Sequence, residues 1–281
     1  MTDTLTVIGS GLMGRGIAYV AATGGHATRV FDVSPEALER AFAQIREDLD
    51  EGVRRGKLTP AGADAAFARL ARHTSLADAV SGASFVIEAV PEDVALKQRT
   101  FAEVERHVGP QVVLASNTSG LPISAIAASA ARPERVIGMH FFNPVPKMKL
   151  VEIVRGPATS EAAIAATTEV ARRMGKETVL VKESPGFLTS RMNALIGNEA
   201  FRMLEAGLAS PADIDKAMKL GLNHPMGPFE LVDLVGLDTR LAVLENLEQE
   251  LGPMYRPSEL LRRYVSEGRL GRKAGRGVYE Y

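Results

Sequence analysis

Residues 5–14 read LTVIGSGLMG, in which an apolar run leads directly into three glycines with the spacing G-x-G-x-x-G. A helical pattern of apolar residues follows to about Ala22, and a second apolar run, residues 27–31, ends in Asp32. This order of strand, glycine-rich turn, helix, strand and acid is that of the dinucleotide-binding fingerprint. Three glycines alone are a weak signal in a chain that has 26, so the order of the elements carries the prediction.

The three glycines have separate predicted roles. Gly9 permits the tight turn after the strand, Gly11 lets the backbone approach a pyrophosphate, and Gly14 allows the helix to pack closely on the strand. The phosphates then bind at the N-terminus of the helix. We therefore expect cofactor contacts at Gly9, Gly11, Leu12, Met13 and Gly14.

Asp32 is the acid that completes this fingerprint, at the end of the second strand. Its carboxylate is expected to bind the adenosine ribose hydroxyls of the cofactor. No Arg stands at positions 33 or 34, where it could bind a 2′-phosphate. The sequence therefore predicts NAD rather than NADP.

Two further apolar runs each contain one polar side chain. Residues 136–142 surround His140, residues 150–154 surround Glu152, and a proline-rich turn lies between the two runs. If the runs fold back symmetrically about Pro146, His140 lies opposite Glu152, about 5 Å away at Cβ. The carboxylate could then orient the imidazole as a general base. The alternative is a buried histidine bonded to backbone, with Glu152 an exposed charge on an edge strand.

The rest of the first 183 residues alternates helices and strands. Helices are predicted over residues 34–55, 60–71, 92–108 and 160–174, and strands over residues 84–90, 112–116 and 177–181. This is a doubly wound parallel pattern of class α/β, so we expect a Rossmann-type NAD-binding domain over residues 1–183. Ligands bind beyond the carboxyl ends of such strands, where Ser116, Asn117, Thr118 and Ser119 stand. These residues suit hydrogen bonds to substrate or ribose, or a simple capping turn.

The strand pattern disappears after residues 183–186, which read ESPG and predict a domain boundary. Helices are predicted over residues 187–206, 211–219, 229–251 and 258–267, giving an all-helical C-terminal domain over residues 184–281. The helix over 229–251 has an apolar face that could pack internally or against a second subunit.

Composition excludes several other classes of protein. The 281 residues suffice for two domains, and the formal charge of −1 is spread without a basic block, which argues against nucleic acid as a partner. Because the chain has no cysteine, thiol catalysis, disulfides and thiolate metal sites are excluded, and we predict no metal site. No apolar run reaches membrane-spanning length, and no charged leader precedes the first strand, so a cytoplasmic protein is expected.

Several longer motifs resemble those of one enzyme family. They are residues 9–14, SNTS at 116–119, GMHFFNPVP at 138–146, KLVE at 149–152, SPGF at 184–187, HPMGP at 224–228 and GRKAGRGVY at 271–279. Together they resemble the 3-hydroxyacyl-CoA dehydrogenases, in particular their bacterial 3-hydroxybutyryl-CoA branch, over essentially the whole chain. The resemblance implies an NAD-dependent enzyme that interconverts short-chain (S)-3-hydroxyacyl-CoA and 3-ketoacyl-CoA. It also implies a C-terminal domain that forms a homodimer.

The resemblance implies roles for individual residues as well. His140 is then the general base, Glu152 its carboxylate partner, and Ser119 a hydroxyl that bonds the substrate. NAD contacts are implied at Asp32, Glu92, Lys97, Asn117, Ser119, Asn143 and Lys273. The basic cluster Arg54, Arg55 and Lys57 is expected to reach the CoA moiety, although such a cluster is also typical of a solvated helix end.

The chain departs from the family pattern at one catalytic position. Family members carry an Asn after the Pro-Gly-Phe motif, and this chain has Ser190 there. Asn193 lies three residues on and shares a helix face with Ser190. The fourth catalytic role therefore falls to Ser190, directly or through a water, or to Asn193.

Two other functions fit the same scaffold. One is oxidation of a free sugar acid such as gulonate, which dependence on a CoA thioester would distinguish. The other is a catalytically silent NAD-binding protein, used structurally or as a redox sensor. The presence of His140, Glu152 and Ser119 together argues against the silent protein.

Overall fold

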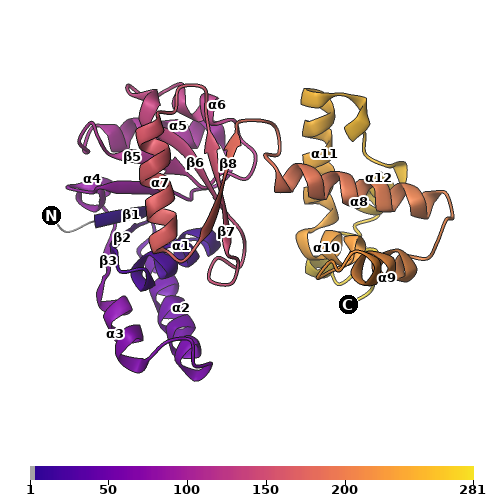
Figure 1. Ribbon diagram of the computed structural model, residues 1–281, viewed down its shortest axis with the longest axis horizontal. Helices are drawn as coiled ribbons and strands as arrows, with labels where there is room; N and C mark the ends of the chain where they lie inside the picture. Colours follow the sequence, from indigo (N-terminus) through magenta and orange to yellow (C-terminus); the bar gives the residue numbers. More distant parts are fainter. Residues whose placement is uncertain (1–3) are drawn as a thin grey trace. The chain divides into compact units, whose positions relative to one another are not determined.

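The computed structural model describes residues 4–281, and the expectation about a leader concerns residues 1–3, which lie outside the described part. The chain divides into two compact units, Met1–Glu183 and Ser184–Tyr281. Figure 1 shows the first unit as a sheet with surrounding helices and the second unit as helices. The predicted fold class, a doubly wound Rossmann-type sheet followed by an all-helical part, is confirmed.

An eight-stranded sheet organises the first unit, in the order β3-β2-β1-β4-β5-β6-β7-β8. The strands are β1 (Thr4–Ile8), β2 (Ala27–Phe31), β3 (Leu70–His73), β4 (Phe85–Glu88), β5 (Val113–Ser116), β6 (Val136–Phe141), β7 (Leu150–Arg155) and β8 (Glu177–Lys182). All neighbours pair in parallel except β6 and β7, which are antiparallel. Strands β1, β4 and β5 are buried along their whole length, as expected where helices cover both faces of a parallel sheet.

The helices of the first unit connect these strands. They are α1 (Leu12–Thr23), α2 (Pro35–Arg54), α3 (Pro60–Ala68), α4 (Leu76–Val80), α5 (Val94–Glu105), α6 (Ile123–Ala127) and α7 (Glu161–Arg173), with a 3₁₀ turn at Pro133–Arg135. α2 begins as predicted at Ser34, whose Oγ accepts from the amide of Ala37 at 3.1 Å. α2 and α3 pack together as a hairpin that extends beyond the sheet (Figure 1).

The structure corrects the helix predicted over residues 60–71. α3 ends at Ala68, and β3 follows as an edge strand paired in parallel with β2. Ala71 and Arg72 in β3 are exposed, so the segment lacks an apolar pattern that would indicate a strand. Backbone pairing with β2, a contact between distant parts of the chain, decides its conformation. The prediction also missed α4 and α6, which have five residues each.

The second unit contains helices packed around one apolar core. They are α8 (Thr189–Glu205), α9 (Pro211–Gly221), α10 (Pro228–Val235), α11 (Leu237–Leu251) and α12 (Glu259–Ser266), with 3₁₀ turns at Pro253–Tyr255 and Arg272–Ala274. The largest core side chains are aromatic: Phe201 and Phe229 pack edge to face with their ring centroids 5.2 Å apart.

The structure also corrects the single helix predicted over residues 229–251. The segment breaks into α10 and α11 at Gly236, whose φ of 107° is one that L side chains rarely adopt. Of the predicted apolar face, Leu244 and Leu247 are fully buried in the core of the second unit. Leu234 and Val235, at the end of α10, are exposed. The predicted apolar face is therefore buried inside the second unit along α11 and exposed at the end of α10.

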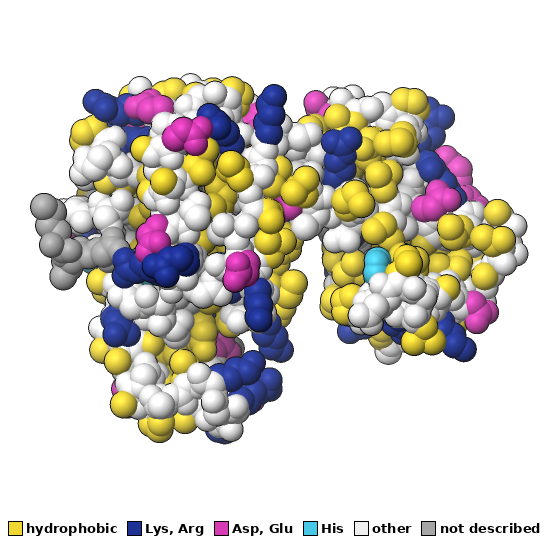
Figure 2. All heavy atoms as spheres, viewed as in Figure 1, with side chains coloured by type: hydrophobic (Ala, Val, Ile, Leu, Met, Phe, Trp, Pro, Cys, Tyr) yellow, Lys and Arg dark blue, Asp and Glu magenta, His cyan; other side chains and the backbone are white. Residues whose placement is uncertain are grey.

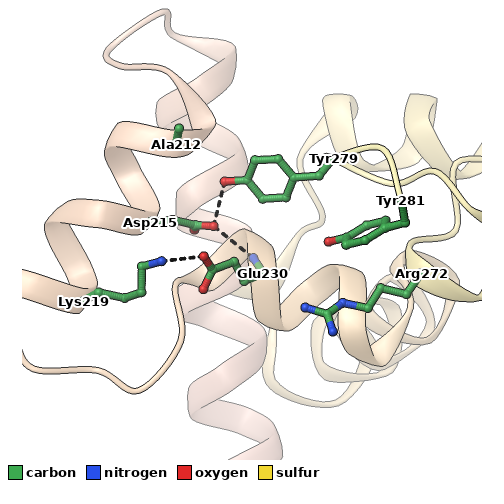
Figure 3. Close-up of a pocket in the computed structure, with 7 residues that line it drawn as sticks. All are labelled: Ala212, Asp215, Lys219, Glu230, Arg272, Tyr279 and Tyr281. Carbon is green, nitrogen blue, oxygen red and sulfur yellow. Dashed lines mark hydrogen bonds and ion pairs between the residues drawn. The ribbon is translucent and has the colours of Figure 1, made fainter.

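Buried carboxylates anchor the C-terminal segment of the second unit. Asp215 of α9 accepts hydrogen bonds from the amides of Phe229 and Glu230 and from the Tyr279 hydroxyl, which lies 2.7 Å away (Figure 3). Asp233 accepts from the amides of Val278, at 2.8 Å, and Tyr279. These bonds give a structural role to the motif at residues 271–279.

Candidate active site

The glycine-rich turn between β1 and α1 has the predicted geometry. Gly9 has a φ of 96°, and a Cβ atom on Gly14 would lie 1.8 Å from the carbonyl oxygen of Gly9. A Cβ atom on Gly11 would meet no atom within 4 Å, so this part of the turn is open. Gly11 is also the N-cap of α1 and makes no side-chain cap, which suits the binding of an anion by the first amides of α1, those of Leu12 and Met13.

Asp32 stands at the end of β2, next to this turn. Its Oδ2 accepts from the Ser10 amide at 2.8 Å and from the Ser10 hydroxyl at 2.7 Å, and its Oδ1 accepts from the Ser34 amide at 3.1 Å. Partial burial acts to raise the pKa of Asp32, but these hydrogen bonds hold it below its ordinary value. Asp32 is therefore an oriented anion, and Ser10 is a partner that the sequence analysis missed.

His140 and Glu152 face each other across β6 and β7. The register pairs them directly, and His140 Nδ1 lies 2.8 Å from Glu152 Oε2. Glu152 is fully buried, and His140 is 7% exposed. The alternative of an outward charge on an edge strand is wrong, because β7 lies between β6 and β8. The predicted contact is thus present, and the Phe142 ring lies 4.5 Å from the imidazole ring between centroids.

The polar loop after β5 lies beside β6, the strand that carries His140. Asn117 Oδ1 accepts from the Phe141 amide at 3.0 Å, which ties the loop to the end of β6. Glu92 Oε1 accepts from the Ser119 amide at 2.8 Å and from the Thr118 hydroxyl at 2.6 Å. Thr118 is fully buried, whereas Ser119 is exposed. The loop is thus held from both sides with the Ser119 side chain at the surface.

Lys97, which was expected to contact the cofactor, is buried and paired with two carboxylates. Its side chain is 1% exposed, and Nζ lies 2.7 Å from Glu88 Oε1 and 3.3 Å from Glu92 Oε2. Burial raises the pKa of Glu88 in spite of the neighbouring Lys97. Burial acts in the same sense on Glu92, but the bond from Thr118 and the charge of Lys97 hold the pKa of Glu92 below its ordinary value. Glu88 was missed in the sequence, where an acid ending an apolar strand was its signal.

A cavity of about 430 Å³ lies between the N-terminal half of α1, the end of α2 and the β6–β7 turn. Its basic lining residues are Arg15, Arg55, Lys57 and Lys147, and Asn143 lines it as well. Figure 2 shows Lys and Arg side chains gathered near the far end of the α2–α3 hairpin. Of the predicted cluster, Arg54 is not a lining residue and pairs with Glu51 at 2.6 Å. Sequence spacing could not distinguish Arg54 from Arg55, which follows it on the helix.

The remaining predicted residues belong to the second unit. Ser190 lies half-buried in the first turn of α8, and Asn193, also half-buried, follows about one turn later. Lys273 Nζ contacts both carboxylate oxygens of Asp238 at 2.7 Å. Over residues 4–281, no group of three or more His, Cys, Asp and Glu side chains could hold a metal ion. No helix in the same range is long and apolar enough to cross a membrane.

Two family models match the chain, each over one part of it. Residues 4–184 match the NAD-binding domain of 3-hydroxyacyl-CoA dehydrogenase, and residues 186–281 match its C-terminal domain. The chain belongs to the 3-hydroxyacyl-CoA dehydrogenase family. It is accordingly an NAD-dependent oxidoreductase that acts on 3-hydroxyacyl-CoA.

Relatives in other organisms support this membership. The chain is 46% identical to a probable 3-hydroxybutyryl-CoA dehydrogenase of Bacillus subtilis, over 99% of this chain and 96% of that protein. It is 42% identical to a 3-hydroxyadipyl-CoA dehydrogenase of Escherichia coli, over 99% of this chain and 59% of that protein. The crystal structure of (S)-3-hydroxybutyryl-CoA dehydrogenase from Ralstonia eutropha superposes with a TM-score of 0.97 at 45% identity, covering 100% and 99% of the two chains.

Proposed function

We propose that this enzyme interconverts (S)-3-hydroxybutyryl-CoA, or a similar short-chain substrate, and the corresponding 3-ketoacyl-CoA. The observation that carries the proposal is the buried His140–Glu152 pair, 2.8 Å between Nδ1 and Oε2, in the same sheet as the dinucleotide turn. The names of relatives from Bacillus subtilis and Ralstonia eutropha support the short acyl chain.

His140 is the general acid and base of this proposal. With Nδ1 on the carboxylate of Glu152, Nε2 takes the proton of the substrate 3-hydroxyl, and the C3 carbon becomes a carbonyl. NAD bound at the dinucleotide turn would supply the acceptor for the hydride that leaves C3. The negative charge of Glu152 stabilises the imidazolium that His140 becomes, and in the reverse direction His140 returns the proton to the oxygen.

Other residues hold the reactants in this proposal. The Ser119 hydroxyl bonds the reacting oxygen, Asp32 binds the adenosine ribose, and the first amides of α1 bind the pyrophosphate. Further NAD contacts are proposed at Glu92, Asn117, Asn143 and Lys273. For Lys273, binding NAD requires the ammonium to be shared with Asp238. We propose a cytoplasmic homodimer formed through the second unit, where Leu234 and Val235 offer exposed apolar surface.

The test of the function is the oxidation of NADH with a panel of 3-ketoacyl-CoA esters of increasing length. We expect kcat/KM to be highest with the four-carbon ester and to fall as the acyl chain lengthens. Gulonate with NAD is the comparison, since it carries no thioester. Turnover of gulonate without turnover of any CoA ester would overturn the proposal, as would a maximum at a long acyl chain.

We predict that the double variant Arg55→Gln with Lys57→Gln raises the KM for the CoA substrate about 10-fold. Both side chains line the cavity beside α2, and a charge-assisted hydrogen bond to a phosphate contributes about 1.5–3 kcal/mol. A pantetheine thioester, which lacks the nucleotide phosphates, should keep its KM. Arg54→Gln is the matched control, because Arg54 pairs with Glu51, a lining residue, but does not line the cavity itself. Equal effects on the CoA and pantetheine substrates would count against a phosphate contact.

We predict that Ser190→Ala lowers kcat about 10-fold, while Asn193→Ala leaves it within about twofold. A serine hydroxyl is shorter than the amide of the family's Asn, so we propose that it reaches the substrate through a water, a contribution of about 1–2 kcal/mol. Asn193 lies about one helical turn further on, a displacement of roughly 5 Å along the axis. Ser190→Asn should keep or raise kcat. Loss of turnover in a folded Asn193→Ala enzyme, with Ser190→Ala unaffected, would transfer the role to Asn193.

A further inference from the structure

A buried carboxylate with no role in the proposed proton transfer ends strand β4. Glu88 is fully buried, and its two oxygens accept from three donors. Oε1 accepts from the Val90 amide and from Lys97 Nζ, both at 2.7 Å, and Oε2 accepts from the Ser116 hydroxyl at 2.7 Å. Burying such a pair is costly, and replacing it with apolar residues is often neutral or stabilising. Stability alone is therefore a weak reason for Glu88 and Lys97 to be charged.

Lys97 connects this carboxylate to the loop that carries Ser119. Its ammonium lies 2.7 Å from Glu88, 3.3 Å from Glu92 Oε2 and 3.4 Å from the carbonyl oxygen of Val90. Nζ donates hydrogen bonds to Glu88 and to the Val90 carbonyl, and it forms an ion pair with Glu92. The 1% exposed side chain thus has its polar end directed at protein groups.

Glu92 contacts both Lys97 and Ser119, the exposed residue of the loop. While Oε2 faces Lys97, Oε1 accepts from the Ser119 amide at 2.8 Å and from the Ser119 hydroxyl at 3.3 Å. The short bond to the amide fixes the position of the residue. The longer contact to the hydroxyl is weak enough to be exchanged for a bond to substrate oxygen. Glu92 is 41% exposed and sits on a loop, where Thr118 and Ser119 hold its Oε1 and the ammonium of Lys97 lies 3.3 Å from its Oε2.

We propose that Glu88 and Lys97 are positioning residues that act through Glu92 to hold the Ser119 hydroxyl in its reactive position. This inference rests on the role proposed above for Ser119. It also changes the role expected of Lys97, from a direct cofactor contact to a support for Glu92. A misplacement of about 1 Å at a reacting group can cost about 10²-fold in rate, so the support of an exposed serine has a measurable effect.

The variant that tests the proposal replaces both buried charges, as Glu88→Gln with Lys97→Met. Removing one charge alone would leave the other uncompensated in the interior and endanger folding. The matched control is Glu105→Gln with Arg135→Met. It removes a second buried ion pair of the first unit, 2.8 Å long, that has no contact with Glu92 or Ser119 among residues 4–281. Ser116→Ala is a milder variant, which loosens Glu88 without exposing a charge.

The measurement is a double-mutant cycle on kcat with Ser119→Ala, using NADH and a short 3-ketoacyl-CoA. We expect Ser119→Ala to lower kcat about 10²-fold, as the loss of an oxyanion donor does elsewhere. The paired Glu88 and Lys97 variant should lower kcat about 10-fold, and Ser116→Ala about threefold, by misplacing that same hydroxyl. Neither should lower kcat further once Ser119 is Ala, because its target is then absent. The control pair should leave kcat within about twofold of the wild type.

Two results would overturn the inference in different ways. If the paired variant keeps the wild-type kcat, or lowers it equally with and without the Ser119 hydroxyl, Glu88 and Lys97 do not act through Ser119. The role of Ser119 itself then stands. If Ser119→Ala keeps the wild-type kcat, the proposed role of Ser119 fails and the inference fails with it.

Discussion

Replacing His140 with Ala is expected to lower kcat about 10²–10⁴-fold, the usual contribution of a positioned general acid or base. The imidazole Nδ1 lies 2.8 Å from the carboxylate of Glu152, which is fully buried. NADH affinity should stay within about threefold, since the dinucleotide turn and Asp32 are on other strands. Steady-state kinetics and NADH fluorescence titration measure the two quantities separately.

Glu152→Gln is the companion variant that separates charge from orientation. The Gln amide oxygen can still accept from Nδ1, so the ring keeps its direction, but the imidazolium loses its neighbouring anion. We expect kcat to fall about 10–10²-fold, less than for His140→Ala, with a thermal midpoint near the wild type. A nearly unchanged kcat for His140→Ala in a folded enzyme would remove His140 from the mechanism.

The hairpin that carries this pair could be predicted because its information is local. Two apolar runs with one polar residue each, placed symmetrically about Pro146, fix which residues face each other once the chain folds back. The observed register pairs His140 with Glu152 as expected. The dinucleotide turn could also be predicted from local sequence, because its strand and its three glycines lie within ten residues of each other.

The features that were missed depend on contacts between distant segments. β3 is a strand because it pairs with β2, some 40 residues earlier in the chain. Lys97 could not be placed from sequence, because its burial depends on the acid at the end of β4 and on Glu92 together. The break at Gly236 had a local signal, a glycine inside a helical pattern, but a glycine there also occurs in continuous helices.

For the basic cluster, too, the sequence could not predict which individual residues line the cavity. Arg54 and Arg55 are neighbours in sequence and both pair with Glu51, yet only Arg55 lines the cavity among these two. Successive residues on a helix point about 100° apart, so one of them faces the cavity and the other turns away. The sequence identified the basic cluster, but which of its residues line the cavity depends on how α2 packs beside α1.

Discrimination between NAD and NADP is the second large effect that we expect. The kcat/KM with NADP should be at least about 10²-fold below that with NAD. Asp32 is held by Ser10 and Ser34 at the place where the adenosine ribose is expected. A carboxylate and a phosphate charge about 5 Å apart repel by about 3 kcal/mol at an effective dielectric constant of 20, which is a factor of about 10².

The sign of the pH dependence follows from the lowered pKa of Asp32. Partial burial opposes the shift, but the bonds from Ser10 and Ser34 keep the carboxylate charged down to a lower pH than an ordinary Asp. Its repulsion of a 2′-phosphate is therefore fully present at neutral and alkaline pH. The repulsion weakens only when the pH falls below the ordinary range of Asp titration. The preference for NAD should thus be constant over the neutral range in which the enzyme is assayed.

A charge exchange at the end of β2 should reverse the preference. Asp32→Ser removes the repelling carboxylate, and Val33→Arg adds a guanidinium at an adjacent side chain that is 83% exposed. Together they should lower kcat/KM with NAD and raise it with NADP, whereas Val33→Gln, with no charge, should leave the wild-type ratio. The ratio of kcat/KM values for the two cofactors, measured at one fixed ionic strength, decides the question because salt screens such exposed charges. Equal or better use of NADP by the wild type would show that Asp32 does not face the ribose 2′ position.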